Sequence, residues 1–289
     1  MNYENKIFVI IRDIKCSKLC GLFSFYFHII TSITKLIDKG YIPIIDLESF
    51  PNIFNGFTNS INKNPWEYFF DQPFGYKLKD VKKYGKNVKY YNIIENFTFP
   101  IPIHKIYNHF LFLYFYHRLA AKYLPIKKEI IKEANFIMRK KFRGSTNILG
   151  ILARGTDYVA ARPKNHPIPP SVEMLIHDIK EMDKKYKYDY YFISTEDNII
   201  RNRLIVEFRD KLKYIKSKTN IEYNYKEKNW LYKNKILYKN IDFHRIYVMN
   251  IFILSKCIDI ITARTGGSIA LFMISDGFRN QKVYYLGYY

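Results

Sequence analysis

Cysteine is scarce in this sequence, and so are the patterns that usually bind a metal. The three cysteines, Cys16, Cys20 and Cys257, have no spacing that suits a disulfide framework or a paired metal site. No H-E-x-x-H, C-x-x-C or D-x-D pattern occurs either. We therefore expect a protein of a reducing compartment that holds no metal ion.

Long apolar runs are missing as well. The longest lipid-like stretches, residues 22–33 and 110–116, fall short of the ~20 apolar residues that span a bilayer. Near the N-terminus, Arg12 and Asp13 follow directly on the apolar run of residues 7–11, which is too short for the core of a signal peptide. These absences favour a cytoplasmic protein. Any contact with lipid is expected to be peripheral, at the inner face of the cell membrane.

Acidic residues are few relative to basic ones, with 26 Asp and Glu against 47 Lys and Arg and a net charge of +21. Such an excess favours nucleic acid, an anionic membrane surface or phosphorylated ligands as partners. Part of it reflects the enrichment in Lys, Asn, Ile, Tyr and Phe that an AT-rich genome encodes. Because the sequence lacks the long solvated tail of a nucleic-acid-binding arm, we do not expect nucleic acid as a partner.

The sequence does have enough apolar residues for well-formed cores, at 48% of 289 residues. Its first part predicts a strand at residues 6–11, a helix at 23–39 and a strand at 42–46. A strand, helix and strand in this order predict a parallel sheet. Residues 52–96 predict loops and short helices, and residues 104–143 predict a helical link to the second part.

In the second part, apolar runs typical of buried parallel strands alternate with segments of helical period. The expected strands are residues 147–153, 190–194, 211–215, 258–263 and 283–286. The expected fold class is therefore α/β, with two Rossmann-like domains that contain parallel sheets. We expect these domains at residues 1–143 and 144–289.

The most informative stretch joins a buried strand to charged residues. Residues 147–153 end in Arg154, Gly155, Thr156 and Asp157. Ligands of open α/β sheets bind beyond the carboxyl ends of the strands, so both charges are expected at a ligand site. Arg154 suits a diphosphate because its guanidinium is a fixed bidentate fork, while Asp157 would orient Arg154 or bind a sugar hydroxyl. The alternative is a structural ion pair at a strand end.

A second strand, residues 258–263, leads into the turn Thr265-Gly266-Gly267-Ser268 at the start of a helix. Free backbone N–H groups and the positive end of the helix dipole make such a turn a site for phosphate. Glycine allows close approach, and Thr265 or Ser268 adds a hydroxyl donor. The alternative is an ordinary turn capped by Thr265, since the turn is neither a P-loop nor a complete G-x-G-x-x-G.

A third strand end carries Ser194, Thr195, Glu196 and Asp197. Acids beyond a Rossmann strand often accept hydrogen bonds from a ribose or a base. Alternatively, they complement the dipole of the helix that follows. His166, in a proline-rich loop, is a candidate ligand donor or general base, and the alternative is an exposed histidine with neither role.

Residues 209–239 combine ten Lys or Arg with three acids, and six aromatic residues lie between them. Basic side chains with aromatic side chains between them are typical of surfaces that bind single-stranded nucleic acid. They equally suit an anionic membrane or a carbohydrate acceptor. The alternative is a solvated surface loop whose composition follows from AT-rich coding.

In these three strand ends the chain resembles the fucosyltransferase superfamily of glycosyltransferases, which includes alpha-1,2-, alpha-1,6- and protein O-fucosyltransferases. The family motif H-x-R-R-x-D lies at a strand end of the C-terminal domain and corresponds to residues 152–157. Arg154 falls on the first arginine, which grips the sugar-nucleotide phosphates in that family, and Asp157 falls on the aspartate. Leu152 replaces the histidine and Gly155 the second arginine, which implies a divergent member of bacterial type.

Other regions are similar to the family as well. Residues 194–197 resemble its second motif, which contacts the nucleoside, and residues 265–268 resemble its third, a small-residue turn against the phosphates. Residues 21–23 are similar to the glycine-containing opening of these enzymes. The resemblance implies a glycosyltransferase B-type fold, with residues 1–143 on the acceptor side and residues 144–289 binding the nucleotide sugar.

The resemblance implies an inverting, metal-independent glycosyltransferase of polysaccharide biosynthesis. The donor would be GDP-fucose or another nucleoside-diphosphate sugar, bound as a substrate with no further cofactor, and the acceptor a surface glycan or a lipid-linked oligosaccharide. The candidates for the general base are Asp13, Asp46, Glu48 and His166. Two alternatives stay open: a non-catalytic protein that binds nucleic acid or an anionic polymer, and another Rossmann-like nucleotide-dependent transferase.

Overall fold

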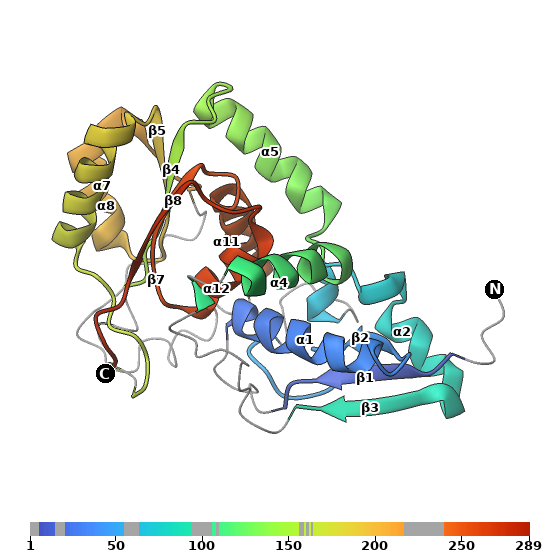
Figure 1. Cartoon of the computed structure of the whole chain (residues 1–289). Coiled ribbons are helices and arrows are strands. Elements are labelled where there is room, and N and C mark those ends of the chain that lie inside the picture. Colours follow the sequence, from blue (N-terminus) through green and yellow to red (C-terminus); the bar gives the residue numbers. More distant parts are fainter. Residues whose placement is uncertain are drawn as a thin grey trace. The chain divides into compact units, whose positions relative to one another are not determined.

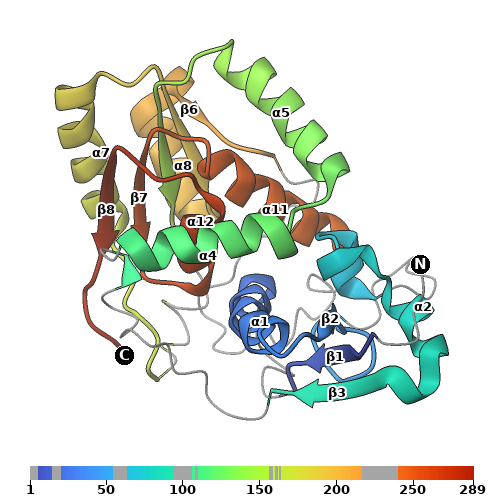
Figure 2. The same cartoon turned by 45° about the vertical axis from the view of Figure 1, so that its right-hand side comes forward.

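The structure is a computed structural model of the 289-residue chain, which divides into two compact units (Figures 1 and 2). The described residues are 6–14, 21–54, 64–93, 106–107, 110–155, 159, 162, 164–216 and 240–289. The first unit comprises Met1–Ile130 and Ile236–Arg245, and the second unit comprises Ile131–Lys235 and Ile246–Tyr289. The chain passes from the first unit to the second within two helices, α5 (Lys128–Phe142) and α11 (Ile241–Leu254).

The first unit contains a parallel sheet of three strands in the order β2-β1-β3. These strands are β1 (Phe8–Arg12), β2 (Ile42–Ile45) and β3 (Val88–Asn92). Residues 8–11 of the central strand β1 are buried, as expected for a continuous apolar run. The helix α1 (Leu22–Ile37) connects β1 to its parallel neighbour β2, so the predicted strand, helix and strand are confirmed.

β3 differs from the expectation, because residues 52–96 predicted only loops and short helices. Its sequence, Val-Lys-Tyr-Tyr-Asn, forms an edge strand whose side chains are half-buried or exposed. Such a strand lacks the apolar run or alternation by which strands are recognised. The described residues of this unit also form η1 (Pro65–Tyr68), η2 (Pro73–Gly75), α2 (Leu78–Val81), η3 (Lys82–Asn87) and α4 (Phe110–Tyr123).

An aromatic cluster around Trp66 packs against α1 in the first unit. Trp66 is fully buried, and its ring centroid lies 4.5 Å from that of Phe70 and 6.1 Å from that of Tyr26 on α1. Gln72 ties this segment to β2, since its Oε1 accepts the N–H of Ile45 at 2.8 Å and its Nε2 donates to the carbonyl of Ile45 at 2.8 Å. The side chain thus satisfies backbone groups at the buried edge of the sheet.

The second unit contains a parallel sheet of five strands in the order β6-β5-β4-β7-β8. Its strands are β4 (Ile148–Leu152), β5 (Tyr190–Ser194), β6 (Leu212–Lys213), β7 (Asp259–Ala263) and β8 (Asn280–Tyr284). Its described residues also form the helices α7 (Val172–Tyr186), α8 (Asn198–Phe208), η4 (Arg209–Lys211) and α12 (Gly266–Ile274). The predicted fold class, α/β with parallel sheets in both parts of the chain, is confirmed.

Helices cover both faces of the sheet in the second unit (Figure 1). On one face, Leu149 and Ile151 of β4 belong to a buried cluster with residues of α7 and α8. On the other face, Gly150 lies against α11, because a Cβ added to it would lie 3.0 Å from Leu254 Cδ2 and 2.9 Å from Ile260 Cδ1. This close approach explains the glycine inside a buried strand.

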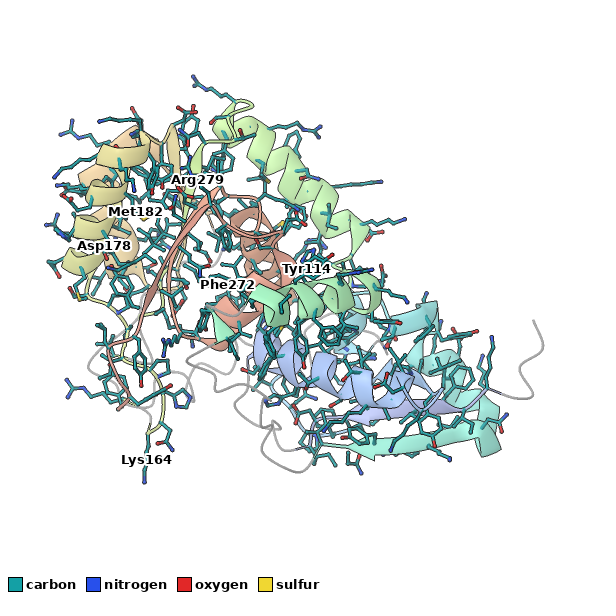
Figure 3. The ribbon with its side chains drawn as sticks, in the orientation of Figure 1. Tyr114, Lys164, Asp178, Met182, Phe272 and Arg279 are labelled. Carbon is teal, nitrogen blue, oxygen red and sulfur yellow. The ribbon has the colours of Figure 1, made fainter. Side chains whose placement is uncertain are left out.

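A buried carboxylate joins the starts of β7 and β8. Asp259 is fully buried, and its Oδ2 accepts from Nη2 of Arg279 at 2.6 Å, while its Oδ1 accepts the N–H of Asn280 at 2.8 Å. Tyr188 donates its hydroxyl to the same carboxylate. Burial alone would raise the pKa of Asp259, but the hydrogen bonds from Arg279 and Tyr188 outweigh it and lower the pKa. Arg279 is labelled in Figure 3.

We expect Asp259→Asn to lower the free energy of unfolding at pH 7 by about 2 kcal/mol, because it weakens hydrogen bonds to a charged group. A carboxylate with a lowered folded pKa stabilises the fold above its ordinary pKa of 3.8. This stabilisation is lost as the pH falls through the lower, folded value. Urea unfolding at a series of pH values should therefore show the difference between wild type and variant shrinking below pH 3.8. A difference that stays constant would contradict this account.

Candidate functional site

The three strand ends singled out in the sequence meet at one edge of the sheet in the second unit. β4 lies between β5 and β7, and all three strands are parallel. The register pairs Leu152 of β4 with Ser194 of β5 on one side and with Thr262 of β7 on the other. The residues that follow these strands therefore share the carboxyl edge, where sheets of this kind bind ligands.

Arg154 forms an ion pair with a carboxylate from the neighbouring strand end. Its Nε lies 3.3 Å from Oε1 of Glu196, and the same oxygen accepts the N–H of Gly155 at 3.3 Å. The side chain of Arg154 is 31% exposed and that of Glu196 is 17% exposed, so solvent reaches both. Thr156 and Asp157 lie outside the described residues, and the expected role of Asp157 stays a prediction. The acid found beside Arg154 thus comes from β5, a pairing that the sequence did not predict.

Asp197 explains the glycine at position 155. It is buried, and its Oδ1 accepts the N–H groups of Ile199 at 2.8 Å and Ile200 at 3.1 Å, which makes it the N-cap of α8. A Cβ added to Gly155 would overlap Oδ2 of Asp197 and lie 2.8 Å from its Cβ. An arginine at position 155, as in the H-x-R-R-x-D motif, does not fit beside this cap. A contact of Asp197 with a ribose or a base stays a prediction.

We expect Gly155→Ala to lower the free energy of unfolding by about 1 to 3 kcal/mol, because the added methyl group displaces the cap of α8. Gly21→Ala is the matched control, since nothing lies within 4 Å of the Cβ added there. It should cost less than about 1 kcal/mol. Urea unfolding measures the stability of both variants. If Gly155→Ala is as stable as Gly21→Ala, Asp197 moves aside at no cost in free energy.

The turn after β7 is a capping box. Thr265 Oγ1 accepts the N–H of Ser268 at 3.2 Å, and Ser268 Oγ accepts the N–H of Thr265 at 2.8 Å. Ser268 is fully buried, and its hydroxyl also donates to the carbonyl of Thr265 at 2.8 Å. Contact of Thr265 or Ser268 with a ligand stays a prediction. The N–H groups of Gly266 and Gly267 open α12 and have no acceptor among the described residues. These amides are the part of the turn that suits a phosphate.

Ser194 and Thr195, the other predicted site residues at the end of β5, make hydrogen bonds to backbone groups. Ser194 is buried, and its carbonyl accepts the N–H of Ala153 at 3.0 Å, which extends the pairing of β4 and β5. Thr195 Oγ1 accepts the N–H of Asp197 at 3.1 Å. Both residues therefore shape the loop that brings Glu196 to Arg154. Direct contact of either one with a nucleotide stays a prediction.

His166 is exposed in a loop that pairs with the C-terminal residues. Its Nδ1 lies 3.1 Å from the carbonyl oxygen of Lys164, and its own carbonyl accepts the N–H of Tyr289 at 3.0 Å. Lys164 projects away from the ribbon at this loop (Figure 3). These contacts hold the loop beside the segment that follows β8. A role of His166 as ligand donor or general base stays a prediction.

Arg264 lies directly between β7 and the capping box, and it was not among the expected site residues. The Cζ of its guanidinium lies 3.9 Å from the centroid of the Tyr285 ring. The signal that indicates Arg154, an arginine where a buried strand ends before glycine, is also present here in Ala263-Arg264-Thr265-Gly266. The same sequence signal therefore also indicates Arg264 as a candidate site residue.

The candidates for the general base in the first unit follow β1 and β2. Asp13 is buried, and its Oδ2 lies 2.5 Å from Nδ1 of His28 on α1. Asp46 is fully buried, and its Oδ1 accepts the N–H groups of Glu48 at 2.8 Å and Ser49 at 2.9 Å. A carboxylate bound to Nδ1 orients a histidine for proton transfer, whereas Asp46 shapes a turn. The sequence indicated Asp13 without its partner His28.

Residues 217–239, which carry most of the basic and aromatic segment, lie outside the described residues, so its expected partners stay predictions. Within the described ranges, no three His, Cys, Asp or Glu side chains gather as a metal site would require. Of the helices in those ranges, none is long and apolar enough to cross a membrane.

Comparison with solved structures identifies the fold. The chain matches NodZ alpha-1,6-fucosyltransferase soaked with GDP-fucose at a TM-score of 0.53 and 12% identity, over 94% of this chain and 93% of that one. It matches POFUT1 in complex with GDP at 0.50 and 9% identity, over 96% and 98% of the two chains, and apo POFUT1 at 0.51 and 9%, over 98% and 99%. No protein-family model matches the sequence, and no curated protein matches it significantly. The chain therefore has the glycosyltransferase B-type fold of these fucosyltransferases, as its sequence predicted.

Proposed function

We propose that the protein is an inverting, metal-independent glycosyltransferase that transfers fucose or a similar sugar from a GDP-linked donor. The observation that carries the proposal is the meeting of Arg154, Glu196 and the glycine amides at one carboxyl edge of a parallel sheet. The fold supports it, because the two fucosyltransferases that share it were solved with GDP-fucose and with GDP. The donor is a substrate, and we propose no further cofactor.

In the proposed transfer, an acceptor hydroxyl oxygen forms a bond to the anomeric carbon while the bond from that carbon to the diphosphate breaks. Negative charge then grows on the leaving diphosphate. The guanidinium of Arg154 and the N–H groups of Gly266 and Gly267 donate to it, which stabilises the transition state more than the ground state. Glu196 orients Arg154 for this task. Cationic and backbone donors of the chain thus take the part that a metal plays elsewhere.

The acceptor hydroxyl must lose its proton, and we propose that the first unit supplies the acceptor side of the reaction. Of the candidate bases there, His28 with Asp13 suits proton transfer better than Asp46, whose Oδ1 is used by a turn. We propose a surface glycan or a lipid-linked oligosaccharide as the acceptor. A net charge of +21 would favour work at the anionic inner face of the cell membrane.

A nucleotide screen tests the proposal. Thermal unfolding with GDP, UDP, TDP or CMP, all in excess EDTA, should show the largest rise in midpoint with GDP, because a ligand of the folded state stabilises it by mass action. Arg154→Ala should lose this rise. The control Arg203→Ala removes the same charge from α8, where its side chain is 49% exposed, and should keep it.

The screen can also contradict the proposal. No rise with any nucleotide, or a rise that Arg154→Ala leaves intact, would do so. Steeply salt-dependent binding to nucleic acid, without nucleotide affinity, would instead favour the nucleic-acid-binding alternative.

A further inference from the structure

A second arginine lies beside Arg154 at the carboxyl edge of the sheet in the second unit. The register that pairs Leu152 with Thr262 brings Arg154 and Arg264 to equivalent positions two residues further on. Adjacent strands lie about 4.8 Å apart, and alternate residues of a strand point to the same face. The register therefore places both residues on the same face of neighbouring strands, Arg154 beside Glu196 of the β5 end and Arg264 beside Tyr285 after β8. A ligand at the carboxyl edge of β4 and β7 lies between the two side chains.

Arg264 is oriented by an aromatic ring. Its Cζ lies 3.9 Å from the centroid of Tyr285, and these two residues come directly after the registered pair Ala263 and Tyr284. A guanidinium is attracted to the face of an aromatic ring and stacks on it. This contact fixes the side chain while using none of its five N–H donors. The donors of Arg264 are thus preorganised for another partner.

Two nitrogens of Arg264, Nε and Nη1, are buried and make no hydrogen bond with any described residue. Buried polar atoms nearly always have a partner, and a charged donor left unpaired costs free energy. Arg279 shows the usual arrangement, because its Nε and Nη2 both donate to the carboxylate of Asp259. No such carboxylate accompanies Arg264 in the described ranges. Its N–H groups suit an anionic ligand.

The charges at the strand ends also favour an anion beside Arg264. Arg154 and Glu196 cancel each other, while Asp197 adds a negative charge at the cap of α8. Among the described residues of the three strand ends, Arg264 is the cation that offsets Asp197. Without it, the described residues of these ends carry net negative charge, which repels a diphosphate. With it, the charges of these described residues sum to zero, and the amino-terminal dipole of α12 favours an anion.

We propose that Arg264 binds the diphosphate of the donor nucleotide, as a second guanidinium beside Arg154. This inference rests on the proposed function and names a further residue of the same site. Position 155 has no room for a second arginine, because Asp197 occupies the space of its side chain. The neighbouring strand supplies the guanidinium instead, from position 264. Each arginine then has a phosphate group to bind.

Calorimetric titration with GDP, pyrophosphate and guanosine tests this role. Arg264→Met removes the charge and the donors but keeps a long side chain on Tyr285. It should weaken the binding of GDP and pyrophosphate by about 10- to 100-fold and leave guanosine unchanged, as expected for lost hydrogen bonds to a charged group. Arg264→Lys should recover part of the affinity, because lysine restores the positive charge but lacks the planar guanidinium that donates two parallel hydrogen bonds. The control Arg203→Ala, on the exposed face of α8, should bind like the wild type.

The thermal midpoint without ligand separates binding from a structural role. Because Nε and Nη1 are buried without a described partner, Arg264→Met should keep or raise this midpoint. Replacing the supporting ring gives a second check, since Tyr285→Ala should weaken GDP binding and Tyr285→Phe should not. A lower midpoint of Arg264→Met with unchanged GDP affinity would show a structural role and overturn the inference.

The remaining outcomes distinguish this inference from the proposed function. If Arg154→Ala loses GDP binding while Arg264→Met keeps it, the inference fails and the proposed function stands. If pyrophosphate binds through Arg264 but no nucleotide binds, the proposed function fails and the anion site stands. If the wild type binds neither GDP nor pyrophosphate, both fail.

Discussion

Arg154→Ala should slow the release of GDP from a GDP-sugar donor by about 100- to 1,000-fold, which corresponds to about 3 to 4 kcal/mol of transition-state stabilisation. In the proposed transfer, the guanidinium donates to oxygens whose charge grows as the donor bond breaks, so its loss destabilises the transition state. Its Nε lies 3.3 Å from Oε1 of Glu196 at the neighbouring strand end. Steady-state assays of free GDP, with EDTA present, measure the rate.

Two further variants separate chemistry from folding in this prediction. Arg154→Lys should recover little activity, because an ammonium group lacks the planar fork that two phosphate oxygens require. Glu196→Gln keeps an oxygen beside Arg154 and should cost less than Arg154→Ala. Thermal midpoints of all three should stay near that of the wild type, since surface ion pairs contribute little to stability. Wild-type rates in Arg154→Ala would remove the residue from the mechanism.

Trp66→Ala should lower the free energy of unfolding by about 3 to 5 kcal/mol, the usual cost of removing a buried aromatic side chain. Trp66 is fully buried and packs against Tyr26 and Phe70, so its loss leaves a cavity between α1 and the short helices of the first unit. Domains have only about 5 to 15 kcal/mol of stability. Urea unfolding should therefore show a large shift of the midpoint.

Leu111→Ala is the control for this variant. It also removes a large apolar side chain from the first unit, but Leu111 is 71% exposed on α4. Its effect should stay within about 0.5 kcal/mol, as for most exposed positions. Trp66→Phe, which keeps most of the ring contacts, should fall between the two. A small effect of Trp66→Ala would mean that the cluster is not part of the folding core.

The fold was largely predictable because its central strands are continuous apolar runs. The sequence predicts β1, β4, β5 and β7, all of which are buried on both faces, and helices of apolar period separate them. β3 was not predicted, because this edge strand, Val-Lys-Tyr-Tyr-Asn, is held to β1 by backbone hydrogen bonds and not by buried side chains. Backbone pairing leaves little trace in the sequence.

The site was predictable only in part. Strand ends that carry Arg154, Glu196 and the glycine turn were found, since the carboxyl edge of a parallel sheet collects ligand-binding residues. The pairing of Arg154 with Glu196 was not, because it joins residues far apart in the chain. The capping role of Ser268 was not predictable either. A serine in such a turn can bind a ligand or cap the helix, and the sequence looks the same in both cases.

³¹P NMR of GDP titrated with the protein in excess EDTA tests whether the strand ends of the second unit hold a nucleoside diphosphate. We expect both phosphorus resonances to shift or broaden with the wild type and with Arg203→Ala, and Arg154→Ala to abolish most of the change. Resonances unaffected by the wild type, or affected equally by Arg154→Ala, would contradict this expectation.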